Sequence, residues 1–342
     1  MGGSIARPAS APPPLTRYAW LSIAAALVTM GMKALAFLIT GSVGLLSDAL
    51  ESTVNLVAAI VALWALTVAS RPADESHAYG HGKVEYFSAG VEGTMIFVAA
   101  TLIIWSAVDR LLHPVELENV GIGLAVSVAA AAVNFAVATV ERRAGKRHRS
   151  ITLEADAKHL MTDVWTSGGV LVAVGMVAVT GWLRLDPIIA IVVAINILVS
   201  GVMLIRRSAA GLMDTALPAE DLAVVEEVMD RYRAADVQFH AVRSREAGQR
   251  RFVSMHVLVP GAWDVQQAHN LVERLEADLR AALPGTTVFT HVEPLEDPAS
   301  FADEGLDRLS LPPSHGPDRR AARRSEPDGR PAPRRDRPSA PS

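Results

Sequence analysis

The sequence predicts a membrane protein in which six transmembrane α-helices precede a small cytosolic α+β domain. Half of the 342 residues are hydrophobic and only a fifth are charged, a balance that a soluble protein of this size rarely shows. Six mostly apolar segments have about the ~20 residues needed to cross a bilayer. After residue 207 the chain becomes more polar and its periodicity changes. Because there is no cysteine, disulfides, thiolate metal sites and thiol nucleophiles are excluded.

The six apolar segments run roughly over 18–40, 43–69, 86–109, 120–141, 152–180 and 186–205. Basic residues collect in the loops on one side of the membrane, above all in the run 142–149, whereas the opposite loops hold only Arg110 and Arg184. The positive-inside rule therefore places both termini in the cytosol, with the protein in the plasma (inner) membrane. The basic run is expected to touch anionic lipid, and no nucleic-acid partner is expected.

The segments outside the membrane divide into three parts. Residues 1–17 are rich in Pro, Ala and Ser and lack a signal-peptide pattern, so we expect a disordered cytosolic leader before a transport domain over 18–207. Residues 214–295 are expected to form the soluble domain, and the Pro- and Arg-rich segment 296–342 a disordered tail.

The soluble domain shows two kinds of periodicity. Residues 221–233 and 264–283 have helical spacing, whereas 237–243, 252–259 and 287–292 read as strands, the first two from their alternation of apolar and polar residues. The predicted order is helix–strand–strand–helix–strand (αββαβ), as in ferredoxin-like and metallochaperone-like domains.

Two matched stripes of polar side chains interrupt the second and fifth apolar segments. Their members share the spacing i, i+3, i+7: Asp48, Glu51 and Asn55 in one segment, and Asp156, His159 and Asp163 in the other. Each trio lies on one face of a helix. A charged group at mid-bilayer costs at least ~2.5–3.5 kcal/mol, so such stripes indicate a function. The last two members of each trio supply four ligands for a divalent cation such as zinc. The alternative is hydrogen bonding across a helix interface.

Two further groups of polar residues could bind metal. Asp74, His77 and His81 lie in the loop after the second segment, where the alternative is a solvated turn. In the soluble domain the candidates lie on separate elements: His240, His256 and His291 on the strands, Glu293 beyond His291, and His269 on the second helix. This distribution favours a binuclear or shared metal site, although each histidine taken singly is more often a surface or core residue. Glu92, in the third segment, either lines a hydrated cavity or is snorkelled or hydrogen-bonded.

Several motifs together resemble the cation diffusion facilitator family of divalent-metal exporters, including bacterial zinc and iron exporters. The matching stretches are TGSVGLLSDALE at 40–51, PADESH at 72–77, GHGK at 80–83, ADAKHLMTD at 155–163, RFVSMH at 251–256, QAH at 267–269 and HVEP at 291–294. The resemblance covers roughly residues 18–295, all but the two ends of the chain.

The resemblance implies a homodimer that pairs through its C-terminal domains and membrane helices. It implies a transport site at Glu51, Asn55, His159 and Asp163, a loop site at Asp74, His77 and His81, and a cytosolic binuclear zinc site at His240, His256, His269, His291 and Glu293. It also implies a hinge salt bridge between Lys83 and Asp214.

The chain departs from the family pattern at three of these positions. Glu51 stands where zinc exporters of the family have Asp or His, Asn55 where they have Asp, and Glu293 where they have Asp. Because Asn55 is neutral and cannot carry a proton, the site has less negative charge than it would have with Asp at this position. The substitution therefore affects which metal is bound and how many protons are exchanged. Asp48, Asp156 and Glu92 are candidates for the proton path or for supporting the ligands.

We therefore expect export of a divalent cation, Zn²⁺ first, in exchange for protons across the lipid bilayer. Metal and protons compete for the same ligands. The alternatives are export of Fe²⁺, Mn²⁺, Co²⁺ or Cd²⁺, a metal-dependent membrane hydrolase, and a non-transporting metal sensor or scaffold. The usual hydrolase motifs are missing, so we expect a secondary transporter and not an enzyme.

Overall fold

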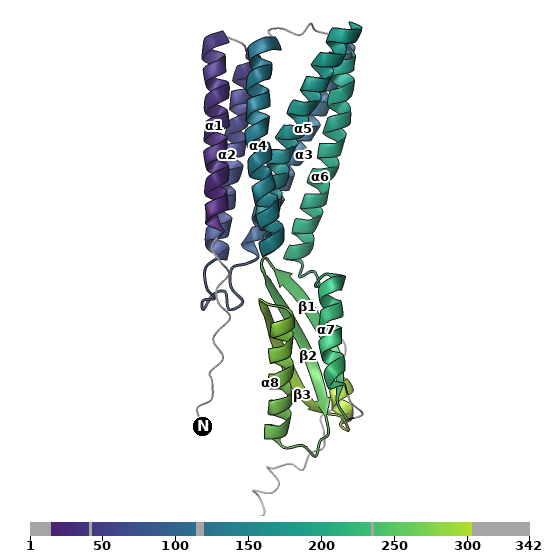
Figure 1. Cartoon of the computed structure of the whole chain (residues 1–342). Helices are drawn as coiled ribbons and strands as arrows, with labels where there is room; N and C mark the ends of the chain where they lie inside the picture. The colour runs from purple at the N-terminus through teal and green to yellow at the C-terminus, as the bar shows by residue number, and fades with distance from the viewer. Residues whose placement is uncertain (1–14, 41–42, 114–119, 234–235, 303–342) are drawn as a thin grey trace, which may run out of the picture.

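The computed structural model describes residues 15–40, 43–113, 120–233 and 236–302, which form a helical bundle standing on a small α/β domain (Figure 1). The bundle helices are α1 Thr16–Thr40, α2 Val43–Ala69, α3 Val84–Leu112, α4 Val120–His148, α5 Ile151–Thr180 and α6 Leu185–Leu212. Within the described residues, five candidate spans are long and apolar enough to cross a membrane, and Asn55–Ala69 of α2 is a shorter apolar helix. The predicted fold class is confirmed.

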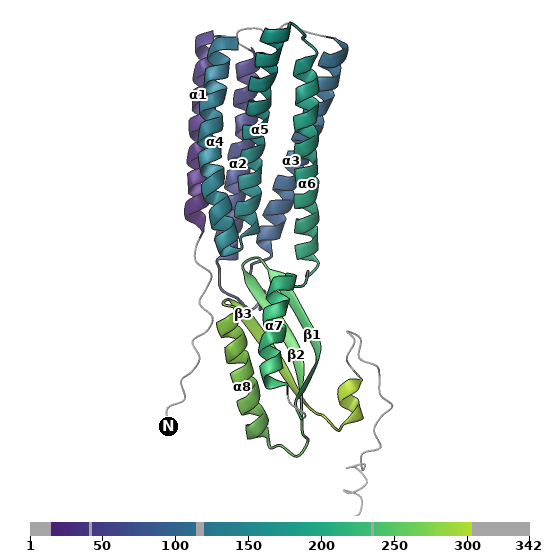
Figure 2. The same cartoon turned by 45° about the vertical axis from the view of Figure 1, so that its right-hand side comes forward.

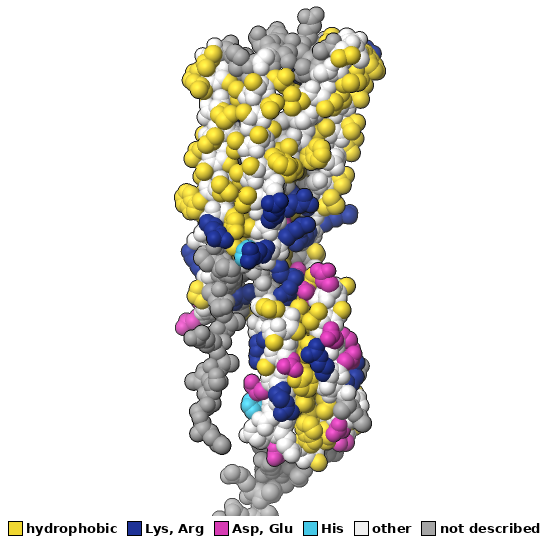
Figure 3. Space-filling view, in the orientation of Figure 1, with side chains coloured by type: hydrophobic (Ala, Val, Ile, Leu, Met, Phe, Trp, Pro, Cys, Tyr) yellow, Lys and Arg dark blue, Asp and Glu magenta, His cyan; other side chains and the backbone are white. Residues whose placement is uncertain are grey.

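Several bundle helices extend beyond the predicted apolar segments at the end that adjoins the soluble domain. The helix α4 continues through the basic run to His148, and α6 continues to Leu212. Helical backbone hydrogen bonds do not depend on an apolar surrounding, and Ala, Arg and Lys favour the helix. Basic side chains gather at this end of the bundle (Figure 3).

The start of α1 differs from the prediction. Leu15 is only 2% exposed and packs in a cluster with Leu66 and Leu153. The helix therefore begins at Thr16 and not after residue 17. Residues 15–17 belong to the bundle because burial of Leu15 fixes them there, and the rest of the predicted leader lies outside the described residues.

The helices pack in pairs, of which α3 with α6 has the most extensive contact. At Gly201 on α6, an added Cβ would meet the carbonyl oxygen of Gly93 and the amide nitrogen of Phe97, both at 3.1 Å. This close approach of two backbones needs glycine. Large hydrophobic side chains such as Trp105 and Leu38 point outward from the bundle, as expected of a lipid-facing surface.

The soluble domain has the predicted element order. Its elements are α7 Ala219–Tyr232, β1 Gln238–Ala247, β2 Arg250–Val259, α8 Val265–Ala282 and β3 Thr286–Pro294. The strand β2 lies in the centre, antiparallel to β1 and parallel to β3, and both helices cover one face of the sheet (Figure 2). The core between the layers includes Val253, Met255 and Leu275.

Two boundaries of this domain were predicted too short. The β1–β2 hairpin continues to Ala247 and Arg250 because its polar residues pair across the strands, although they lack the apolar alternation of a buried strand. A short 3₁₀ helix, Pro298–Phe301, lies within the predicted tail. The Ser300 hydroxyl donates to the carbonyl oxygen of Pro294 at 2.8 Å, which ties this turn to β3. Residues 303–342 lie outside the described part of the chain.

Candidate metal-binding sites

The helices α2 and α5 bring three of the four predicted transport-site residues into contact inside the bundle. Asn55 and His159 are 7% and 5% exposed. Nε2 of His159 lies 3.0 Å from Oδ1 of Asn55, and Nδ2 of Asn55 donates to Oδ2 of Asp163. Because Oδ1 of Asn55 accepts, Nε2 of His159 is the donor in this conformer. The side chains of Glu51 and Asp48, also on α2, lie outside the described part of the structure.

A fourth residue, Asn134 of α4, reaches the same carboxylate. Its Nδ2 donates to Oδ2 of Asp163 at 3.1 Å, and its side chain is buried. From the sequence alone, Asn134 is interpreted as a helix-packing residue. The signal that could have found it is an amide side chain in an otherwise apolar stretch of the fourth span.

A cavity of about 300 Å³ adjoins Asn55 and Asp163. Its lining includes Lys33 of α1 and Asp186, which lies in the first turn of α6 at the end of the bundle farther from the soluble domain. Asn55 and Asp163 therefore border a cavity on that side, which charged and apolar side chains line together.

The opposite side of these residues is occupied by buried acidic groups. Asp156 lies one turn before His159 on α5 and is 1% exposed, and Glu92 of α3 is fully buried. Glu141 of α4 is also fully buried near them. Sequence reasoning missed Glu141 because it sits where the fourth apolar segment gives way to the basic run. Glu92 is neither snorkelled nor hydrogen-bonded to any described residue.

The loop residues Asp74, His77 and His81 come together as a compact group. Oδ1 of Asp74 lies 3.2 Å from Nδ1 of His77, and Oδ2 lies 3.3 Å from Nε2 of His81. One ligand atom from each residue lies within 4.8 Å of the others, a spacing that could hold a metal ion. The backbone amide of His77 donates to the Asp74 carboxylate, which lowers the pKa of that group and keeps it ionised.

In the soluble domain the strand register aligns three histidines in one row. His240 pairs with His256 across β1 and β2, and His256 pairs with His291 across β2 and β3. Glu293 is 5% exposed and lies beside all three: its Oε2 is 2.9 Å from Nε2 of His240 and 3.2 Å from Nδ1 of His256, and its Oε1 is 3.4 Å from Nε2 of His291. His240, His256 and Glu293 meet the spacing for a metal ion.

His269 stands apart from this row within the described chain. It is exposed on α8 and lines a cavity of about 430 Å³ together with Glu293 and Trp263. His269 therefore faces the region around Glu293. It is not part of the group of His240, His256 and Glu293 that meets the spacing for a metal ion.

The membrane and soluble domains are joined by ion pairs. Nζ of Lys83 lies 2.9 Å from Oδ1 of Asp214, which also accepts from Arg245 at 3.1 Å. The hydrogen bond from Lys83 is the main cause of the lowered pKa of Asp214.

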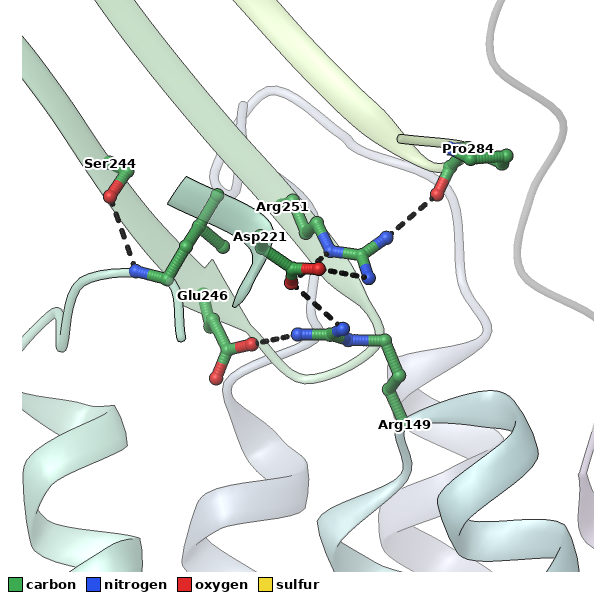
Figure 4. Close-up of polar contacts among 7 residues, drawn as sticks. Arg149, Asp221, Ser244, Glu246, Arg251 and Pro284 are labelled. Atoms are coloured by element: carbon green, nitrogen blue, oxygen red, sulfur yellow. Dashed lines mark hydrogen bonds and ion pairs between the residues drawn. The ribbon is translucent and has the colours of Figure 1, made fainter. Parts of the chain in front are cut away.

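A second group of ion pairs centres on Asp221. This carboxylate contacts Arg149, from the loop between α4 and α5, and Arg251 of β2, and Arg149 also pairs with Glu246 of β1 (Figure 4). Buried Glu85 of α3 accepts from Ser150 and, at 3.0 Å, from Gln249 at the hairpin tip. The tip of the β1–β2 hairpin is thus bonded to α3 and to the start of α5.

Comparison with known families matches both halves of the chain. The family described as the cation efflux transmembrane domain matches residues 19–213, and the cation efflux protein cytoplasmic domain, named ZT_dimer, matches residues 217–295. The chain belongs to the cation efflux family. This family member is therefore a membrane transporter of divalent metal cations and not an enzyme, and its ZT_dimer domain fits a homodimer.

The chain is also similar to individual relatives and to a solved structure. The chain is 54% identical to the uncharacterized transporter sll1263 of Synechocystis over 83% of this chain and 92% of the relative. It is 30% identical to the cation-efflux pump FieF of Serratia proteamaculans over 84% of this chain and 97% of the relative. The metal-bound C-terminal domain of the CzcD transporter from Thermotoga maritima matches at 27% identity, covering 24% of this chain and 98% of that chain with a TM-score of 0.22.

Proposed function

We propose that this transporter exports Zn²⁺ from the cytosol across the plasma membrane in exchange for protons, as a homodimer with both termini inside. The observation that carries the proposal is the contact of His159, Asn55 and Asp163 between two buried helix faces. Imidazole, amide and carboxylate are metal ligands, and Glu51 on the same helix as Asn55 supplies a fourth. The groups at Asp74 and at Glu293 are proposed as further metal sites.

Proton exchange follows from the chemistry of these ligands. Nε2 of His159 cannot bind metal while it carries a proton, so metal and proton compete for the same atom. Imidazole is the side chain whose charge ordinarily changes between pH 5 and 8, which suits exchange across a membrane with one acidic side. Rocking of the helices then exposes the site to one face at a time.

The test uses full-length protein in vesicles that contain a zinc-sensitive dye, with an imposed pH gradient. We expect Asp163→Ala to abolish zinc flux, because it removes the carboxylate that both Asn55 and Asn134 contact. Asp236→Ala, an exposed residue between α7 and β1, is the matched control and should transport like the parent. Parental flux in Asp163→Ala would refute the site assignment.

A second candidate is export of Mn²⁺ or Fe²⁺. Two amides contact Asp163, and His159 is the single imidazole among these contacts, so the donor set is rich in oxygen. Such sets suit harder cations than zinc. Uptake measured for each metal separately distinguishes zinc export from export of Mn²⁺ or Fe²⁺. If Asn55 determines which metal is preferred, Asn55→Asp should change the order in which the metals are preferred.

A further inference from the structure

Three buried carboxyl groups meet between the transport site and the soluble-domain end of the bundle. Glu92 of α3 and Glu141 of α4 are 0% exposed, and Asp156 of α5 is 1% exposed. Electrostatic interactions join Asp156 to each of the two glutamates. We call Glu92, Glu141 and Asp156 the acidic triad.

The acidic triad has no basic counterpart among the described groups that act on it. The charged and titratable groups outside the triad that face it are Asp163 and His159, both on α5. From α1 the neighbour is the neutral Ser22. Near Glu92, α6 packs against α3 through Gly201 and Ile205, which carry no charge. Both carboxyl oxygens of Glu92 are buried without a hydrogen-bond partner in the described chain, whereas the Asp156 carboxyl group interacts with Ser22 and with Glu141. An ionised carboxylate in such a place is strongly unfavourable, whereas a protonated carboxyl group is neutral.

A stripe of buried polar groups connects the acidic triad with the domain junction. Glu85, Ser88 and Glu92 follow the spacing i, i+3, i+7 on α3, so they share one face of the helix. All three are fully buried. The Ser88 hydroxyl, like the Glu92 carboxyl group, has no hydrogen-bond partner among the described residues, although a hydroxyl can both accept and donate a proton. Glu85, at the far end, already bonds Gln249 of the soluble domain.

The transport site itself has few ligands that can bind a proton. Asn55 cannot bind a proton, so the site itself has one proton-carrying ligand fewer than it would have with a carboxylate there. Glu92 and Glu141 offer that capacity beside Asp156, which lies one helical turn before His159 on α5.

We propose that Glu92 and Glu141 carry protons that this transporter exchanges for metal. Together the two carboxyl groups take up one proton that enters through the cavity beside Asp163, and they release it along the Ser88–Glu85 face when the soluble-domain end opens. The inference rests on the antiport function proposed above.

The experiment counts protons per metal ion in vesicles of full-length protein, with a zinc dye and a pH dye recorded together. The variants are Glu92→Gln, Glu141→Gln and the double substitution, since glutamine resembles the protonated carboxyl group in shape and leaves the fold intact. Glu273→Gln, on the exposed face of α8, is the matched control. We expect the double variant to move about one proton fewer per metal ion and to lose part of the acceleration by a pH gradient.

The outcomes separate the two proposals. An unchanged proton count in the double variant, beside a proton-coupled parent, overturns the role of Glu92 and Glu141 and leaves the antiport function standing. A parent that moves no protons overturns both. If the variant instead binds metal more weakly at equilibrium while its proton count per metal stays parental, the acidic triad binds metal and the inference is wrong.

Discussion

Nη1 of Arg149 lies 2.9 Å from Oδ2 of Asp221, and this ion pair joins the loop between the fourth and fifth membrane helices to the first turn of α7. Arg149 adopts a left-handed backbone conformation with φ of 57°. Its neighbour Ser150 caps α5, the helix that carries His159 and Asp163. The soluble domain is thereby held next to the start of the helix that bears two predicted ligands.

Removing this ion pair should loosen the soluble domain. Arg149→Ala leaves Asp221 with Arg251 alone and removes the partner of Glu246. We expect hydrogen exchange of the amides in the hairpin segment 244–251 to rise about tenfold, which corresponds to about 1.4 kcal/mol. Arg143→Ala, an exposed residue of the same basic run, should leave exchange unchanged. Equal protection in the two variants would show that Arg149 does not hold the domains together.

Asn134 should support metal binding through Asp163. Its hydrogen bond orients the Asp163 carboxylate, so Asn134→Ala should weaken metal affinity about 10- to 100-fold, as loss of a group that orients a ligand commonly does. Isothermal titration of the detergent-solubilised protein measures this. Asn196→Ala, an exposed amide of α6, is the control. If both variants bind metal equally well, the contact between Asn134 and Asp163 has no role in the site.

The ion pair between Lys83 and Asp214 should be insensitive to pH across the physiological range. Because the hydrogen bond from Lys83 holds the pKa of Asp214 below its ordinary value, the stabilisation is complete above that ordinary value and is lost only as pH falls through the lowered pKa. Proteolysis of the junction as a function of pH should therefore be flat from pH 5 to 8 in the parent. Asp214→Asn should raise the rate of cleavage at every pH in this range. A change in the cleavage rate of the parent with a midpoint near pH 6 would contradict this account.

The row of histidines predicts unequal effects in the soluble domain. His256 lies in the centre of the row and contacts Glu293, so His256→Ala should abolish zinc binding there, whereas His269→Ala should weaken it less. Zinc stoichiometry and affinity of the full chain, measured with the transport site disabled by Asp163→Ala, give the comparison. A larger loss in His269→Ala would place His269 at the centre of the site.

The local pattern of the chain was enough to predict its architecture. Runs of apolar residues with about bilayer length indicate membrane helices whatever their neighbours are, since hydrophobic length is a local property. Period-two alternation and the stripe of apolar residues on α8 likewise predict the αββαβ order. The spacing of Asn55, His159 and Asp163 also suffices to put the polar groups of each helix on one face.

Contacts between distant segments were decided by the packing of the helices and by the strand register. Asn134 and Glu141 lie on α4, and no spacing within one helix reveals that they face α5. His240, His256 and His291 form a row because of the pairing of three strands, which a shift of one residue would destroy. Burial changes what a carboxyl group can do, because it removes the water that stabilises the charge. Whether Glu92 is an exposed acid or a proton carrier is therefore a property of the folded bundle.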